Sequence, residues 1–231
     1  MKYVLISLII TIVIVFRRFL LNLPLLLYYV IYDFIHYEKK IPYGCWFFVG
    51  RQGSGKTISL VKALDNFKAQ YPKVKIYTNF SYTKQDGKLG DIYDITNKDL
   101  YGDFGTIFAI DEIQNEFSAT RQTNFPVEVL STVTQQRKQQ ILILCTSQVF
   151  TRVSKPLREQ AFRVIECSTF FGRYTINKHY DGIDYADTVE LAPDTKRSRR
   201  PSIHYYSFVQ DNKIRSEFNT FEVIKRLKRG E

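Results

Sequence analysis

The run Gly50–Thr57 has the composition of a loop that can hold a phosphate group. It reads Gly-Arg-Gln-Gly-Ser-Gly-Lys-Thr and matches Gly-x4-Gly-Lys-Ser/Thr at every fixed position. Glycines let backbone N–H groups wrap a phosphate, and the N-terminus of a following helix adds partial positive charge. Lys56 is then placed to reach the β- and γ-phosphates, and the Thr57 hydroxyl to ligate Mg²⁺. The sequence therefore predicts an ATP and Mg²⁺ site made by Gly50, Arg51, Gln52, Gly53, Ser54, Gly55, Lys56 and Thr57.

Two adjacent carboxylates, Asp111 and Glu112, follow the apolar run Thr106–Ile110, which is typical of a buried strand. Such a strand would deliver both side chains to the same edge of the sheet as the glycine-rich loop. Asp111 can hold the Mg²⁺ shell, and Glu112 can orient and deprotonate the attacking water. A protein that only binds nucleotide needs the first role alone, so the pair predicts hydrolysis, with Glu112 and Lys56 as catalytic residues.

The apolar run Ile141–Cys145 ends in the polar residues Thr146, Ser147 and Gln148. In sheets of this type the strand after the acidic pair lies between the acidic strand and the loop strand. A polar side chain at its end can then sense the γ-phosphate. We choose Gln148 over its two neighbours as this third catalytic residue.

Short apolar runs alternate with helical patterns through the middle of the chain. Cys45–Val49 is typical of a buried strand, Lys56–Gln70 has helical spacing, and Pro126–Arg137 is expected to form another helix. This alternation predicts an α/β fold for residues 41–170, with a mostly parallel sheet flanked by helices. Residues 171–231 contain aromatic β segments at Gly172–His179 and Ile203–Val209, and we expect a small β-rich extension with a basic tail there.

Residues 1–40 are strongly apolar. Tyr3–Phe16 is followed by Arg17 and Arg18, and then by a second apolar run, Phe19–Tyr37. Fourteen helical residues cover about 21 Å, less than the roughly 30 Å of a bilayer core. A cleaved signal peptide is not favoured, because no small-residue cleavage site follows the apolar run. Two spans are not favoured either, because the two-residue connection at Arg17 and Arg18 is too short for a helical hairpin.

We therefore favour one membrane-spanning helix, with the other run lying along the inner surface; which run spans stays open. The basic residues that follow then place the ATPase domain on the cytoplasmic side of a host inner or plasma membrane, or of a virion membrane.

The formal net charge of +10 favours contact with polyanions, either DNA or an acidic membrane surface. The basic clusters Lys196–Arg200 and Lys225–Arg229 can contact a DNA backbone without reading its sequence, or can be a solvated loop and a solvated tail. Three scattered cysteines give no disulfide or metal-site pattern, so Cys45, Cys145 and Cys167 are expected to be reduced and buried.

Together, the glycine-rich loop, the acidic pair, and the segment Arg137–Gln148 followed by Leu157 and Arg163 resemble the FtsK/HerA-type motor ATPases. More narrowly they resemble the zonular occludens toxin-like assembly ATPases of filamentous phages, over roughly residues 43–170. The resemblance implies a RecA/ASCE-like fold and a ring-like homo-oligomer with ATP sites between subunits. It further implies action on phage DNA, contact with coat or other assembly proteins, and Gln148 on the phosphate-sensing strand. An arginine would act on the neighbour's nucleotide, with Arg137, Arg152 and Arg158 as candidates.

The function expected is a membrane-anchored ATPase that drives DNA translocation, in phage DNA packaging or in virion assembly and extrusion. An N-terminal membrane segment also keeps conjugative coupling ATPases in view. The alternative from another class is a membrane-associated nucleotide switch or kinase that does not act on DNA. A switch would not need Glu112, and the guanine-reading Asn-Lys-x-Asp pattern is absent from the sequence.

Overall fold

The computed structural model describes residues 2–36, 40–119, 125–191 and 202–219. The chain divides into two compact units, Met1–Lys39 and Lys40–Glu231. The basic clusters at Lys196–Arg200 and Lys225–Arg229 lie outside the described residues. Each unit is described below by itself.

The first unit is one continuous helix, α1, Lys2–Ile35. It joins the two predicted apolar runs, because Arg17 and Arg18 interrupt neither the backbone nor the helical pattern, and it also contains Pro24. From Phe19 to Ile35 nearly every side chain is exposed. Among the residues that the structure describes, no helix combines the length and the apolar character needed to cross a membrane. The predicted span therefore stays a prediction.

The second unit is built on an eight-stranded sheet with the order β3-β2-β4-β5-β1-β6-β7-β8. Strands from β3 to β6 pair in parallel, whereas β7 is antiparallel to both of its neighbours. The strands are β1 Gly44–Val49, β2 Lys75–Thr78, β3 Gly87–Lys88, β4 Thr106–Ile110, β5 Ile141–Ser147, β6 Ala161–Phe170, β7 Tyr174–Asp181 and β8 His204–Val209. The predicted mostly parallel α/β fold is confirmed, and β5 lies between β4 and β1 as expected.

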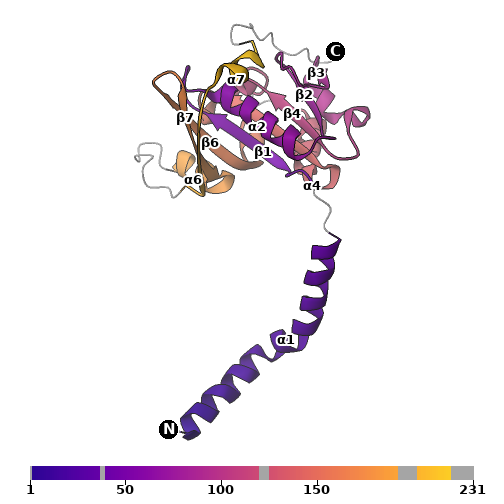
Figure 1. The fold of residues 1–231 in the computed structure, drawn as a ribbon, viewed down its shortest axis with the longest axis vertical. Helices are drawn as coiled ribbons and strands as arrows, with labels where there is room; N and C mark the ends of the chain where they lie inside the picture. The colour runs from indigo at the N-terminus through magenta and orange to yellow at the C-terminus, as the bar shows by residue number, and fades with distance from the viewer. Residues whose placement is uncertain (1, 37–39, 120–124, 192–201, 220–231) are drawn as a thin grey trace. The chain divides into compact units, whose positions relative to one another are not determined.

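Helices cover both faces of this sheet (Figure 1). They are α2 Lys56–Gln70, α3 Val127–Thr134, α4 Gln136–Gln139, α5 Lys155–Arg158, α6 Gly182–Leu191 and α7 Asn212–Ser216, with 3-10 turns η1 Ile92–Thr96, η2 Lys98–Leu100, η3 Ile113–Asn115 and η5 Phe150–Arg152. Neighbouring strand residues pack on opposite faces: Phe48 belongs to the core under α2 and α7, and Phe47 to the core under α3, α5 and α6. Because both faces are covered, every residue of β4 and β5 is buried, which explains their continuous apolar runs.

Several segments differ from their predicted form. The single helix predicted at Pro126–Arg137 is two helices, because Gln135 has φ −103° and ψ 15° and interrupts the helical backbone. The segment from Thr83 to Gly105, for which the sequence gives no strong period, contains β3, η1 and η2. Helix α6 was not predicted. The β segments predicted at Gly172–His179 and Ile203–Val209 correspond to β7 and β8, which extend the sheet of the preceding residues.

Candidate nucleotide site

The glycine-rich loop begins where β1 ends and closes at the first turn of α2. Gly53 and Gly55 have φ of 76° and 86°, a backbone region that residues with a Cβ rarely adopt. Gly50 N–H donates to the Ser147 carbonyl at 3.3 Å, which ties the start of the loop to β5. The sequence places glycine where the left-handed turns occur, so the loop can expose N–H groups toward a ligand.

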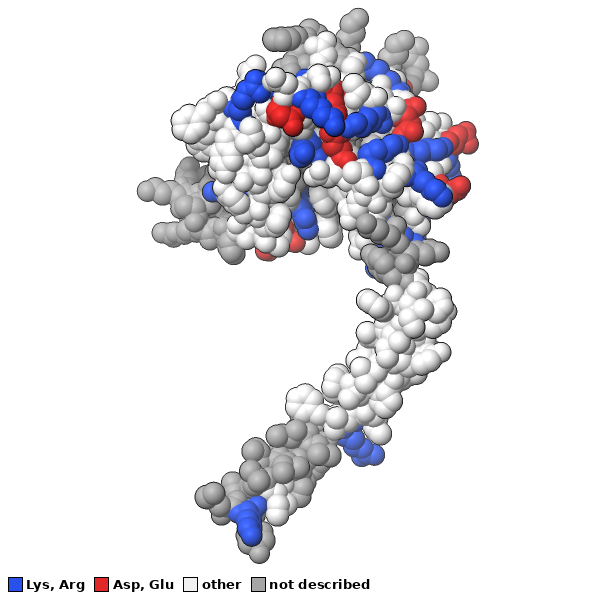
Figure 2. All heavy atoms as spheres, in the orientation of Figure 1, with Lys and Arg blue, Asp and Glu red and all other residues white. Residues whose placement is uncertain are grey.

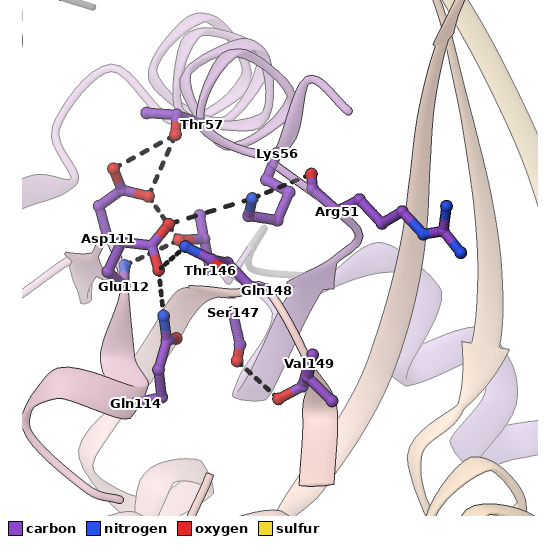
Figure 3. A network of polar contacts seen from close by, with 10 residues as sticks. All are labelled: Arg51, Lys56, Thr57, Asp111, Glu112, Gln114, Thr146, Ser147, Gln148 and Val149. Carbon is purple, nitrogen blue, oxygen red and sulfur yellow. Dashed lines mark hydrogen bonds and ion pairs between the residues drawn. The ribbon is translucent and has the colours of Figure 1, made fainter. Parts of the chain in front are cut away.

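Lys56 is the first residue of α2, and its side chain is only 6% exposed. Its ammonium group donates to the Arg51 carbonyl at 3.4 Å and lies 4.0 Å from a Glu112 carboxylate oxygen. Figure 3 shows Lys56 turned toward the acidic residues, while the Arg51 side chain extends away from them. The Lys56 side chain therefore lies between the glycine-rich loop and the acidic pair.

Thr57 and Asp111 come from different elements and meet at the predicted metal position. The Thr57 hydroxyl lies 3.1 Å and 3.2 Å from the two carboxylate oxygens of Asp111. A hydroxyl and a carboxylate are the oxygen ligands that Mg²⁺ uses beside nucleotide phosphates, the remaining positions being water. These residues therefore fit the predicted Mg²⁺.

Asp111 is held on several sides. Its backbone N–H donates to Asn79 Oδ1 at 2.8 Å, and Asn79 Nδ2 donates to its carbonyl at 3.0 Å. The Thr146 hydroxyl donates to its carboxylate. Burial raises the pKa of Asp111 and the Glu112 charge adds to the rise, against the lowering effects of the Thr146 and Thr57 hydroxyls and of Lys56. A divalent cation at this point would compensate for the burial of the ionised carboxylate.

Glu112 follows directly and has a left-handed backbone, with φ 53° and ψ 49°. This conformation is uncommon for a residue other than glycine and is found mostly where structure over-determines it. Here the Glu112 N–H donates to the Thr146 hydroxyl at 2.8 Å, and its carboxylate accepts from Gln114 Nε2 and, at 3.4 Å, from Gln148 Nε2. The turn directs Glu112 toward Lys56 while Asp111 faces Thr57 (Figure 3).

The three polar residues at the end of β5 have different positions. Gln148 contacts the Glu112 carboxylate, whereas Ser147 points its hydroxyl at the Val149 carbonyl, 2.9 Å away. Thr146 contacts both acidic residues. The structure thus brings the chosen Gln148 to the site, and it adds Thr146, Asn79 and Gln114. Asn79 directly follows β2, and a polar residue at the end of a buried strand is the signal by which the sequence could have identified it.

The candidate arginines are scattered. Arg137 lies in α4, before β5 begins and hence at the sheet edge opposite the loop, with its guanidinium 5.9 Å from the Tyr43 ring centre. Arg158 is buried at 8% exposure, beside Phe150. Arg152, in η5, is exposed.

The three cysteines are free and buried, as expected. Burial raises the pKa of the Cys45 and Cys167 thiols to about 12 and raises that of Cys145 well above its ordinary value. Within the described ranges, no group of three or more His, Cys, Asp or Glu side chains could hold a metal ion. The cysteines therefore belong to the core, and the Thr57–Asp111 pair is the candidate metal position.

No protein-family model matches the chain, and no curated protein sequence matches it. The N-terminal domain of zonular occludens toxin from Neisseria meningitidis superposes with a TM-score of 0.52 at 17% identity, covering 76% of this chain and 98% of that chain. The genome packaging NTPase B204 from Sulfolobus turreted icosahedral virus 2, in complex with ATP-gammaS, gives a TM-score of 0.48 at 17% identity over 75% of this chain and 93% of that chain. The first likeness confirms, at the level of the fold, the resemblance read from the sequence.

Proposed function

We propose that this protein is a membrane-anchored ATPase that drives DNA translocation in phage genome packaging or virion assembly. The observation that carries the ATPase part is the convergence of Lys56, Thr57 and the acidic pair at one end of the sheet. These side chains come from α2 and from the end of β4, and the Thr57 hydroxyl is 3.1 Å from Asp111.

In this proposal each residue of the site has its own task. The loop N–H groups and Lys56 offset the negative charge of the phosphates. Thr57 and Asp111 would hold Mg²⁺, which would supply charge neutralisation for the bound phosphates. Glu112, directed by Thr146 and oriented by Gln114 and Gln148, accepts the proton of the attacking water. Lys56 and Glu112 lie only 4.0 Å apart. When nucleotide binds, Lys56 would have to exchange this contact with Glu112 for contacts with the phosphates.

DNA as the substrate is supported by the net charge of +10 and by the resemblance to zonular occludens toxin-like ATPases. On the face drawn in Figure 2, lysines and arginines of the core are interspersed with acidic side chains. Lys84 is paired with Asp65 at 2.6 Å and with Glu217 at 2.8 Å, so not every lysine is available to a polyanion. The support for DNA is therefore the overall excess of positive charge, which favours contact with backbone phosphates without sequence preference.

Attachment to a membrane is supported by α1, whose apolar side chains between Phe19 and Ile35 are nearly all exposed. An exposed apolar surface of this size needs a partner, and lipid is one that fits a helix without a polar face. In the assembled motor, exposed Arg152 is our candidate for contact with the nucleotide of a neighbouring subunit.

The test is the ATPase rate of the full-length protein in detergent or lipid, with and without DNA. We expect hydrolysis that rises when DNA is added, and a Lys56→Ala variant that loses hydrolysis. A rate indifferent to both single- and double-stranded DNA would favour the nucleotide switch or kinase. Undiminished hydrolysis by Lys56→Ala would remove the site assignment itself.

A further inference from the structure

A second polar cluster lies on the other side of the loop, away from the acidic pair. Thr169 is on β6, Thr175 is on β7, and Gln210 follows β8. Thr175 is fully buried and Gln210 is 5% exposed. The two threonine hydroxyls are 3.0 Å apart, and Gln210 Nε2 donates to Thr175 at 2.8 Å. Buried polar groups of this kind have to be satisfied by one another or by the backbone.

The donors in this cluster can be assigned from chemistry. Arg215, on α7, has only donors, and its Nε and Nη2 donate to Gln210 Oε1 at 3.1 Å and 2.7 Å. The amide oxygen of Gln210 is thereby used, so its nitrogen donates onward to Thr175. At the other end Thr169 donates to the Ser54 carbonyl at 3.0 Å, which leaves Thr175 to donate to Thr169. The chain of hydrogen bonds therefore runs in one direction, from a guanidinium to the phosphate loop.

This chain ends on the peptide that joins Ser54 to Gly55. In a trans peptide the C=O and the following N–H point in opposite directions. Because Thr169 holds the Ser54 carbonyl on the β6 side, the Gly55 N–H is turned the other way, into the loop. The backbone N–H groups of such a loop are the groups that bind phosphate oxygens.

Packing around Gly55 also restrains the orientation of the Ser54–Gly55 peptide. A Cβ placed on Gly55 would lie 2.4 Å from the Thr169 hydroxyl and 3.3 Å from that of Thr175. One turn further along α2, the buried Ser59 hydroxyl donates to Asn177 of β7 at 2.9 Å. The hairpin of β6 and β7 is thus in contact with both the end of the loop and the start of the helix.

We propose that Thr169, Thr175 and Gln210 are positioning residues for the phosphate loop, and call them the loop brace. The brace sets the orientation of the Ser54–Gly55 peptide before a ligand binds, so that less reorganisation accompanies phosphate binding. It makes β7, β8 and α7 part of the nucleotide site. The identity of the ligand rests on the proposed function, but the orientation of the loop does not.

The experiment compares two isosteric substitutions in the full-length protein. Thr169→Val removes the last donor of the brace. Thr106→Val is the control: it removes a threonine hydroxyl that is more deeply buried than that of Thr169 and that accepts from Gly102 N–H at 2.9 Å where β4 begins. Both variants should lose thermal stability, Thr106→Val at least as much as Thr169→Val. We expect Thr169→Val alone to weaken binding of ADP with Mg²⁺ by about tenfold, as for the loss of one hydrogen bond. Thr169→Ser, which keeps the hydroxyl, should restore the affinity.

A second readout needs no nucleotide. Amide hydrogen exchange at Ser54, Gly55 and Lys56 should become faster in Thr169→Val and stay unchanged in Thr106→Val. Wild-type ADP affinity together with unchanged exchange in Thr169→Val would overturn the brace, as would equal effects in the two valine variants. If the wild-type protein binds no ADP while loop exchange still responds to Thr169 alone, the brace stands and the proposed ATPase function falls.

Discussion

The two sides of the phosphate loop are built from different chemistry. On the β4 and β5 side, Asp111 and Glu112 are ionisable and lie close to Lys56. On the β6 to β8 side, Thr169, Thr175 and Gln210 of the brace are neutral, and Arg215, which is not part of the brace, donates to Gln210 at its outer end. The first side can exchange protons and ligate a cation; the second can only hold a shape.

This difference has an energetic reason. An ionised carboxylate in a buried site is costly unless a ligand or cation compensates it, so the acidic side is adapted to a bound state. Satisfied neutral hydrogen bonds have no such cost, and the brace can persist with or without ligand. We therefore expect substitutions on the acidic side to change turnover, and substitutions on the brace side to change affinity and folding.

The largest expected effect is that of Glu112→Gln. The amide keeps the size of the side chain but cannot accept a proton from water, so the ATP turnover number should fall by roughly 10²- to 10⁴-fold. Binding of ADP should change little, because Glu112 is not part of the loop. Steady-state hydrolysis and calorimetric titration with ADP measure the two quantities separately. Turnover close to that of the wild type would mean that another residue is the general base. The contrast between a catalytic acidic side and a structural brace side would then not hold.

The second expected effect compares two glycines with similar backbones. Gly53→Ala and Gly55→Ala both place a Cβ on a left-handed residue, with φ of 76° and 86°, at a cost of about 1–2 kcal/mol in the free energy of unfolding. A Cβ at Gly53 meets nothing within 4 Å, whereas one at Gly55 meets the Thr169 hydroxyl at 2.4 Å. Gly55→Ala should therefore lose a further ~1–3 kcal/mol through overpacking.

Urea unfolding of both variants measures this difference. Adding Thr169→Ala to Gly55→Ala should recover part of the loss, since the overlap is then removed, while adding it to Gly53→Ala should not. Equal losses in the two glycine variants would mean that β6 does not confine the loop.

The acidic side was accessible from the sequence, and the brace was not. Gly50–Thr57 and the acidic pair are contiguous motifs whose chemistry depends on nearby residues. Strand β4 was likewise accessible from the sequence, because its apolar run is continuous; its bounds, Thr106–Ile110, are those predicted. Thr169 and Thr175 become neighbours only through the antiparallel pairing of β6 with β7. Their contacts with Ser54 and Gln210 join residues 115 and 35 positions apart, which local sequence does not specify. An apolar strand pattern also gives no reason to single out its occasional threonine.

Other differences also come from long-range structure. The preference for Gln148 rested on its place at a strand end, but buried Thr146 on the same strand reaches both acidic residues, because β5 lies next to β4. The expected boundary near residue 170 followed a change in composition. The sheet continues across it, since the edge of a sheet is set by strand pairing and not by composition.

The smallest expected effect concerns the neutrality of the β7 side. His179, on β7, has its Nδ1 buried without a hydrogen-bond partner. Burial, together with the nearby Arg163 and His204, lowers the pKa of His179 to about 4 from the ordinary value of 6.5. Between these values the unfolded chain binds more protons than the folded one, so the free energy of unfolding decreases as the pH falls from 6.5 toward 4.

A single histidine contributes a slope of at most about 1.4 kcal/mol per pH unit, and a partly exposed one contributes less. Urea unfolding at several pH values should therefore give a shallower dependence for His179→Gln than for the wild type in this window, and the same stability difference at every pH above 7. His204→Gln is the companion variant, because it removes one of the groups that lower the pKa of His179; the steep region should then narrow from its low-pH end, while its upper limit near 6.5 stays. Parallel curves for the wild type and His179→Gln would mean that folded His179 accepts a proton as readily as it does in the unfolded chain. The contrast between a titrating acidic side and a neutral brace side would then not hold.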